Sequence, residues 1–309
     1  MPYRGELFAL LTAMCFTGSG LLFAVASKKT GPLPANHFRL AAGVPALLVI
    51  CRLLTGEWWP FDLSTERAAL LVASGLVGLV LGDIGFFHAL ATVGPRISTV
   101  VMATWPAVTV AIAAVQGRLP DWPVLLGITM TIAGVALVLL RSPDGASWRP
   151  GITRRMQFSG IAGALLGAVG QAIGFELAGL GMAAAADAPT GVDPLQATVV
   201  RMTAALVGLQ LVATVQHAPA AFVAVVHDRR ALQAAAWGAL FGPIGGVTLS
   251  MMARKHAAVP SVAGALIATT PVFMMPVARF VYGARIGALG VLGTLVAVAG
   301  VAVCLLNRR

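Results

Sequence analysis

The sequence contains one unit twice, and this duplication limits the fold more than any other feature. The pattern P-L-x-A-x-x-x-R at positions 32–39 recurs at 194–201, and A-G-V-A at 133–136 recurs at 299–302. The offset between the copies drifts in one direction along the chain, as small insertions in one ancestral unit would produce. Long repeats within a membrane chain are typical of transporters built from two halves.

Lipid is the solvent that this composition requires. Hydrophobic residues make up 58% of the 309 residues, charged residues make up only 10%, and the mean hydropathy is +0.89. A soluble protein carries about 25% charged residues, so this chain has too few to cover a surface in water. The apolar segments are continuous instead of alternating, and the 35 glycines favour close contacts between helices. We therefore expect an all-α integral membrane protein.

Ten apolar segments are long enough to cross a bilayer as helices, since one crossing takes about 20 residues. The first repeat, residues 1–145, and the second, residues 156–309, contain five segments each and are joined by a linker at 146–155. Five is an odd number, so the second repeat must enter the membrane in the opposite sense. We therefore expect ten transmembrane helices in two inverted five-helix repeats, with the substrate site where the repeats meet. The segments fall roughly at 6–27, 36–55, 68–92, 95–116, 122–141, 157–181, 195–216, 231–253, 260–282 and 286–306.

The net charge of +10 does not indicate a nucleic-acid partner in this chain. The basic residues stand mostly at the ends of apolar segments, where they anchor helices at the membrane interface. Cys15, Cys51 and Cys304 lie far apart and have neither metal-site nor disulfide spacing. The sequence has no G-x-x-x-x-G-K-[ST] loop, which disfavours ATP-driven pumping by this chain. We expect no metal and no other cofactor.

Motifs in the third and fourth spans resemble those of EamA-type transporters, which belong to the drug/metabolite transporter superfamily. The segment G-D-I-G-F-F-H-A-L at 82–90 is followed by G-P-R at 94–96 and then by Pro106, in the family's order. The P-L-x-A-x-x-x-R pattern at the start of the second and seventh spans also resembles the family. The resemblance covers essentially the whole chain.

This resemblance implies a central cavity between the halves, both termini in the cytoplasm, and export or exchange of small solutes. The basic residues lean weakly the other way, toward termini outside. Family members usually end the fourth and ninth spans with a Gly-Glu pair, whereas this chain has Q-G-R at 116–118 and Y-G-A at 282–284. The role of that glutamate therefore does not carry over to this chain.

Two carboxylates lie within apolar segments and are the main candidates for substrate binding or coupling. Asp83 is in the third span and Glu176 is in the sixth. An ionised carboxylate at mid-bilayer costs about 2.5–3.5 kcal/mol, so each should face the bundle interior or a hydrated cavity. Either could bind a substrate amine or a coupling proton. Alternatively, each could be held by a backbone group or a nearby arginine.

Two further polar residues lie near these acids in the sequence. Gln171, five residues before Glu176, could donate hydrogen bonds to substrate or tie two helices together. His88 could take part in a proton relay or pack between helices. A spacing of five residues places His88 about 140° around the helix from Asp83, so a direct pair between them is not expected.

The remaining candidates are residues that could shape a cavity or bend a helix. Trp105 could stack on substrate or pack in the core. Ser19, in the small-residue stretch 17–20, could leave room for substrate or permit close helix contact. Pro106 and Pro271 share one repeat position, and a proline within a span removes a backbone hydrogen bond and kinks the helix. The kinked spans could act as hinges during alternating access, and packing within the bundle is the other interpretation.

Arg39 and Arg201 occupy equivalent positions near the starts of the second and seventh spans. A long basic side chain at a helix end can extend to the membrane interface, which favours a role as an anchor or as half of a helix-end ion pair. The other interpretation is that the two arginines act as gate residues. The sequence leaves both interpretations open.

Together these features predict a secondary transporter in the cell (inner) membrane that crosses it many times. It would move small metabolites, such as amino acids or amphipathic solutes, by alternating access around a midplane cavity, with protons as a hypothetical coupling ion. Its partners would be the lipid bilayer and a small-molecule substrate, and it would act as a monomer or a homodimer. A membrane enzyme acting on lipid and a channel are the alternatives.

Overall fold

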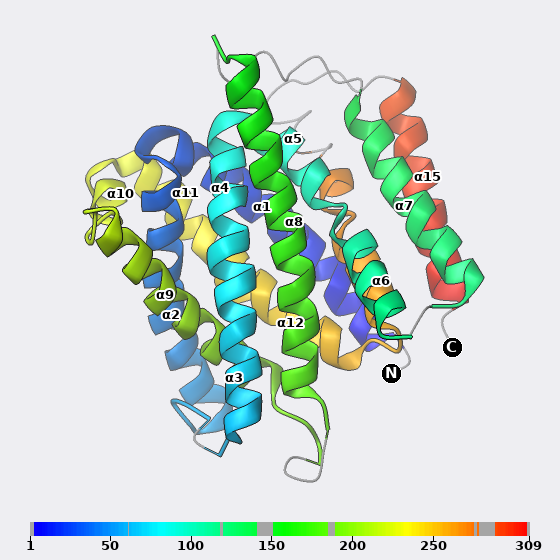
Figure 1. Cartoon of the computed structure of the whole chain (residues 1–309), viewed down its shortest axis with the longest axis horizontal. Helices are drawn as coiled ribbons and strands as arrows, with labels where there is room; N and C mark the ends of the chain where they lie inside the picture. Colours follow the sequence, from blue (N-terminus) through cyan, green and yellow to red (C-terminus); the bar gives the residue numbers. More distant parts are fainter. Residues whose placement is uncertain are drawn as a thin grey trace.

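The computed structural model is built from helices (Figure 1), as the composition predicts. It describes residues 3–60, 62–117, 120–140, 151–184, 189–274, 277 and 288–307, and within these ranges it has no strand. Residues 146–150 of the predicted linker lie outside the described residues, and the next long helix begins at Arg154. The ends of the predicted ninth and tenth spans also fall partly outside them.

The helices follow the predicted segments closely in both halves. Those of the first half are α1 (Arg4–Thr30), α2 (Pro32–Thr55), α3 (Thr65–Ser74), the π-helix η1 (Gly75–Gly82), α4 (Asp83–Thr92), α5 (Gly94–Met102), α6 (Trp105–Val115) and α7 (Trp122–Leu140). Those of the second half are α8 (Arg154–Met182), α9 (Pro194–Val215), α10 (Val223–His227), α11 (Arg229–Ala239), the π-helix η3 (Leu240–Val247), α12 (Thr248–His256), α13 (Pro260–Ile267) and α15 (Ala288–Leu306).

Within the described ranges, six continuous helical stretches are long and apolar enough to cross a membrane. They are Arg4–Thr30, Pro32–Thr55, Thr65–Thr92, Arg154–Met182, Pro194–Val215 and Arg229–His256. Shorter apolar helices lie where the other spans are expected, at Trp105–Val115, Trp122–Gly134, Val262–Met274 and Ala288–Gly300. The number of ten spans and the inversion of the repeat stay predictions.

Glycine and proline separate the helices where local chemistry requires a turn. Gly31 alone divides α1 from α2 with φ of +99°, a conformation that favours glycine. Gly94, with φ of +84°, makes the same kind of turn between α4 and α5. Asp193 caps α9 by accepting a hydrogen bond from the Leu195 amide at 2.9 Å, and Pro194 occupies the first turn.

The fourth and ninth spans are each interrupted by a two-residue turn just before Pro106 and Pro271, and the role of these prolines as hinges stays a prediction. The fourth span stops at Met102 and resumes at Trp105, while the ninth stops at Ile267 and resumes at Thr270. Each proline therefore stands in the first turn of the new segment, where its missing N–H leaves no hydrogen bond unmade. The two interruptions share one repeat position.

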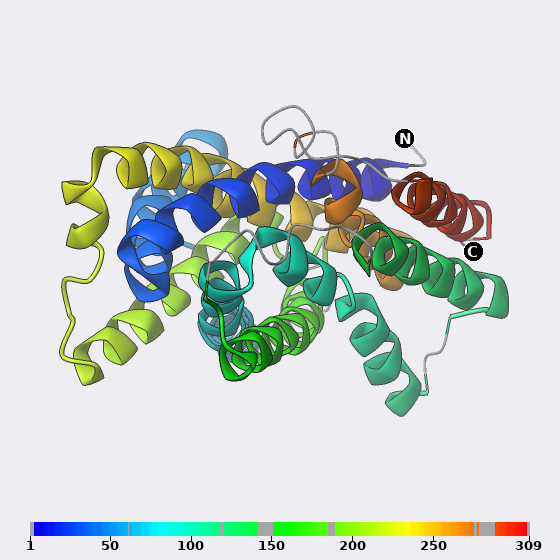
Figure 2. The same ribbon diagram turned by 90° about the horizontal axis from the view of Figure 1, so that it is seen from above.

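The two halves contact each other reciprocally. Helix α8 of the second half packs along α3, η1 and α4 of the first half. Helix α1 of the first half likewise packs along α11, η3 and α12 of the second half. The remaining equivalent helices pair with each other, α2 with α9 and α7 with α15, and the α7–α15 pair lies side by side at one edge of the molecule (Figure 2). A two-fold relation between the halves would produce such contacts.

Candidate functional site

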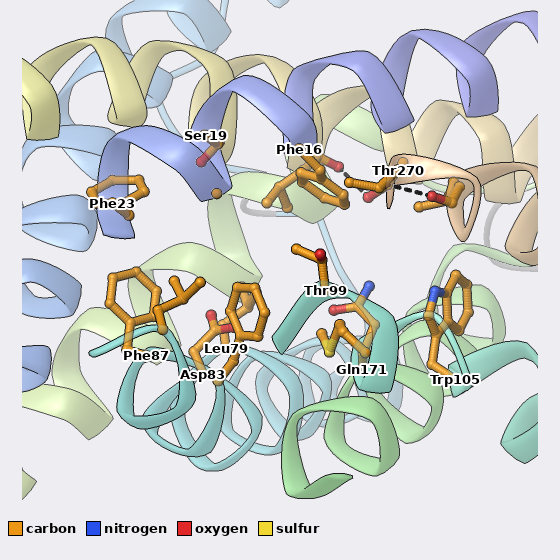
Figure 3. A pocket seen from close by; sticks show the side chains of 18 of the residues that line it. Phe16, Ser19, Phe23, Leu79, Asp83, Phe87, Thr99, Trp105, Gln171 and Thr270 are labelled. Carbon is orange, nitrogen blue, oxygen red and sulfur yellow. Dashed lines mark hydrogen bonds between the residues drawn. The ribbon is translucent and has the colours of Figure 1, made fainter. Parts of the chain in front are cut away.

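A cavity of about 100 Å³ lies where the two halves meet (Figure 3). Both broken spans reach it, through Ala103 and Trp105 in the fourth and through Ala268, Thr270 and Pro271 in the ninth. Discontinuous helices at corresponding positions of two halves are the usual place for a transporter's substrate site. The other lining residues are Phe16, Ser19, Gly20, Phe23, Arg39, Leu79, Asp83, Phe86, Phe87, Leu90, Thr99, Met102, Gln171, Arg201, Gly242, Val247, Ser250 and Ile267.

Asp83 and Arg39 form a buried ion pair in the wall of this cavity. The pair joins Arg39 Nη2 on α2 to Asp83 Oδ2 at the first residue of α4, directly after the π-helix η1. Arg39 Nε also donates to Asn36 Oδ1 at 3.1 Å, and its guanidinium lies 5.3 Å from the centre of the Phe87 ring. The carboxylate thus reaches the cavity already bound to a cation.

Arg201, the repeat counterpart of Arg39, also lines the cavity but has a different environment. Its side chain is only 1% exposed, and Nη1 lies 2.8 Å from the sulfur of Met251. Arg201 interacts electrostatically with Asp83, but among the described contacts no hydrogen bond joins these two side chains. Arg39 and Arg201 are therefore both buried at the cavity instead of extending to the membrane interface as anchors.

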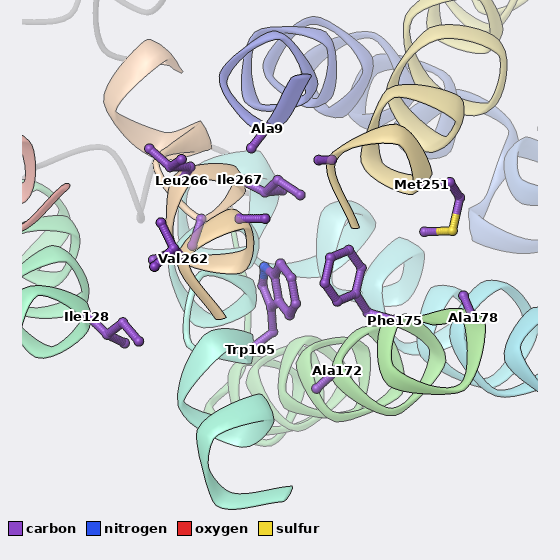
Figure 4. Packing of buried hydrophobic residues seen from close by; sticks show 14 of the residues in the cluster. Ala9, Trp105, Ile128, Ala172, Phe175, Ala178, Met251, Val262, Leu266 and Ile267 are labelled. Carbon is purple, nitrogen blue, oxygen red and sulfur yellow. The ribbon is translucent and has the colours of Figure 1, made fainter. Parts of the chain in front are cut away.

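Three other candidates also face the cavity. Ser19 on α1 donates to the Gly238 carbonyl at 3.2 Å. Gln171 on α8 lines the same space from the opposite side (Figure 3). Trp105 of α6 contacts Phe175 of α8 edge to face, with ring centroids 5.1 Å apart, and both rings belong to a buried apolar cluster to which several helices contribute (Figure 4). Trp105 thus borders the cavity and packs in the core at once.

Glu176 and His88 do not line the cavity. Glu176 Oε2 pairs with Arg254 Nη2 of α12 at 3.3 Å, and Arg254 lies 5.5 Å from the centre of the Phe175 ring. His88 Nε2 lies 3.2 Å from Ser159 Oγ of α8. His88 and Asp83 do not contact each other among the described hydrogen bonds, in accord with their spacing on the helix.

The aromatic lining was missed from the sequence. Phe16 and Phe23 of α1 face Phe87 of α4 across the cavity (Figure 3), and Phe86 of α4 also lines it. In the sequence, the G-F-F-H segment that contains two of these rings indicates only the resemblance to the family. Thr17, in the small-residue stretch of α1, donates to the Thr270 carbonyl at 2.9 Å and so binds α1 to the broken ninth span. No periodic signal marks these residues, because every face of the spans is apolar.

Comparison with known proteins bears on the fold and the family. Residues 3–140 match the family model for the EamA-like transporter family, which confirms the predicted resemblance over the first half. No curated protein matches the sequence. One solved structure, described only as the crystal structure of a protein, has a TM-score of 0.69 and 18% identity and covers 100% of both chains. At this identity the likeness concerns the fold alone.

Proposed function

Since residues 3–140 belong to the EamA-like transporter family of the drug/metabolite transporter superfamily, we propose that this membrane protein is a secondary transporter. Members of the family are transporters rather than enzymes. Its substrates would be small metabolites, either amino acids or amphipathic solutes, and it would export or exchange them. We also propose the cell (inner) membrane as its location, and a monomer or homodimer as its active form.

The observation that carries this proposal is the cavity between the halves. Both halves contribute lining residues, and both interrupted spans border it. Each interruption leaves a two-residue turn whose backbone can bend more easily than a continuous helix. Rocking of one half against the other about these turns would expose the cavity to each side of the membrane in sequence, which is alternating access.

Counterflow in proteoliposomes tests the proposal. A thermal-shift screen of amino acids, nucleobases and amphipathic drugs on the purified protein first selects a ligand. Liposomes loaded with this ligand should then accumulate labelled ligand in a saturable manner, because a carrier exchanges solutes through one alternating site. Protein-free liposomes serve as the control. Single-channel currents together with non-saturable flux would contradict a carrier and support a channel.

Proton coupling is a further part of the proposal, and Asp83 is its best-placed carboxylate. Asp83 lies in the cavity wall between two arginines, whereas Glu176 is engaged by Arg254 outside the cavity. A carboxyl that exchanges its proton with the cavity can alternate between binding Arg39 and releasing it. His88 lies outside the cavity, beside Ser159, and we assign it no part in this step.

Uptake under an imposed pH gradient tests the coupling. In Asp83→Asn we expect gradient-driven uptake to be lost while counterflow persists, because counterflow needs no net proton movement. Glu176→Gln is the matched control, and we expect it to keep its gradient dependence. If both variants respond to the gradient as the wild type does, neither carboxylate carries the coupling proton.

A further inference from the structure

Arg201 is a buried cation whose hydrogen-bonding groups are poorly matched by the protein. The residue is 1% exposed, and among the described residues Nη1 lies 2.8 Å from the thioether sulfur of Met251 while Nε has no hydrogen-bond partner. A thioether is a weak acceptor, whereas a guanidinium presents five N–H donors. The side chain lines the cavity, so a ligand there could accept from it.

The repeat shows which partner is missing. Arg39 holds the equivalent position in the first half, where it binds the Asp83 carboxylate and the Asn36 amide oxygen. In the second half the place that corresponds to Asp83 falls at Val247 or its neighbour, and Val247 also lines the cavity. One arginine of the pair therefore has a carboxylate from its own half, whereas the half that contains Arg201 has an apolar side chain at the corresponding position.

The cavity wall consequently carries unbalanced charge. Its ionisable members are Arg39, Arg201 and Asp83, which leaves one positive charge in surroundings that are otherwise largely apolar and aromatic. An uncompensated charge away from water is costly, and a planar guanidinium is suited to bind a carboxylate or a phosphate through two donors. The facing rings of Phe16, Phe23 and Phe87 could contact an apolar body attached to such a group.

We propose that the substrate is an amphipathic organic anion whose carboxylate or phosphate group binds Arg201 in the cavity while its apolar part packs against the phenylalanine rings. The substrate's anion would supply to Arg201 what Asp83 supplies to Arg39. This inference rests on the proposed transport function and specifies the chemical class of the solute.

A series of ligands that differ only in the head group tests it. Phenylacetate, phenyl phosphate, phenylacetamide and phenethylamine are titrated calorimetrically into the purified full-length protein. We expect one of the anions to bind about tenfold or more tightly than the amide, as charge-assisted hydrogen bonds require, and the amine not to bind. The comparison of the two anions identifies the head group. An amide or amine that binds as tightly as both anions overturns the inference.

Matched arginine variants locate the contact. Arg201→Lys keeps the charge and removes the paired donors, so it should weaken binding of the anion about tenfold, and Arg201→Met should remove the preference for the anion over the amide. Arg254→Lys changes the arginine that pairs with Glu176 outside the cavity and should leave the affinity unchanged. Unchanged affinity in Arg201→Lys overturns the inference, and the ligand series decides the matter even if Arg201→Met fails to fold.

Counterflow separates this inference from the transport function. If phenethylamine or phenylacetamide is exchanged and neither anion is, transport stands and the anionic substrate is overturned. If phenylacetate or phenyl phosphate binds through Arg201 but no solute is exchanged, the site stands and the transport function is overturned.

Discussion

The contact between Arg39 and Asp83 shows how a single ion pair can be kept inside an apolar bundle. Removing two charges from water is expensive, and their mutual attraction offsets this cost only when additional groups also bind them. Asn36 and the Phe87 ring supply such groups to Arg39. Each member of the pair therefore depends on the other, and removal of one leaves a buried charge.

Loss of the Asp83 charge should destabilise the protein more than loss of the whole pair. We expect Asp83→Asn to lower the free energy of unfolding by about 3 kcal/mol, because Arg39 then stays charged and buried. The double variant Arg39→Met/Asp83→Leu should recover much of this loss, since similar-sized apolar groups replace both ions. Denaturant titration in mixed micelles measures the difference. A double variant less stable than Asp83→Asn would contradict this account.

At the scale of elements, helices approach closely where glycines face each other. The crossing of α4 and α8 places Gly85 against Gly163, so that a Cβ atom added at Gly163 would lie 2.6 Å from the Gly85 carbonyl oxygen. Gly82 and Gly170 meet in the same way further along, where a Cβ atom added at Gly170 would lie 2.7 Å from the Gly82 Cα. Small residues at such contacts let two backbones pack directly in a membrane. This crossing holds the third span, and with it Asp83, against the sixth.

Adding one methyl group at this crossing should separate the helices. We expect Gly163→Ala to lower the free energy of unfolding by about 1–3 kcal/mol, because the facing backbone cannot move aside as a flexible side chain would. Gly18→Ala is the control, since its Cβ would lie at an ordinary 3.6 Å from the Phe241 ring and alanine favours the helix. Equal stability of the two variants in denaturant titrations would show that the close crossing is not important.

At the scale of the whole molecule, the cavity is the feature that requires both halves. The first half supplies the ion pair and all of the aromatic rings that line the cavity, and the second supplies Gln171, Arg201 and the broken ninth span. These groups come together because α1 packs on the third span of the second half and α8 packs on the third span of the first half. Function should therefore be lost when the space between the halves is filled, even though the fold persists.

Filling the cavity from α1 tests this dependence. A Cβ atom added at Gly20 would lie 3.9 Å from its nearest neighbours, Thr99 Cγ2 and Met274 Cε, so a leucine there has room to extend into the cavity. We expect Gly20→Leu to reduce counterflow to the level of protein-free liposomes while size-exclusion profiles stay unchanged. Gly18→Leu, on the same helix but directed at Phe241, should retain transport. Normal counterflow in Gly20→Leu would place the substrate path elsewhere.

The site shows where reasoning from sequence stops. A carboxylate in an apolar segment must turn inward, and Asp83 does so. The same rule does not say which neighbouring helices such a carboxylate turns toward. Glu176 turns toward Arg254 instead of the cavity. Helix geometry alone separates two of the predicted site residues. Gln171 and Glu176 are five residues apart, so they lie about 140° apart around α8 and could not both face one cavity.

The sequence by itself determined the local features of this protein: its helices, the turns between them, the likeness of its halves and the residues that must avoid lipid. These follow from hydropathy, glycine, proline and charge over a few adjacent residues. Only the tertiary structure decided that Asp83 pairs with Arg39, 44 positions away, and that Arg201 faces the cavity without its own carboxylate. Such pairings depend on how helices distant in sequence are rotated and packed against one another. Because the faces of these apolar spans are similar, the local sequence does not predict that rotation.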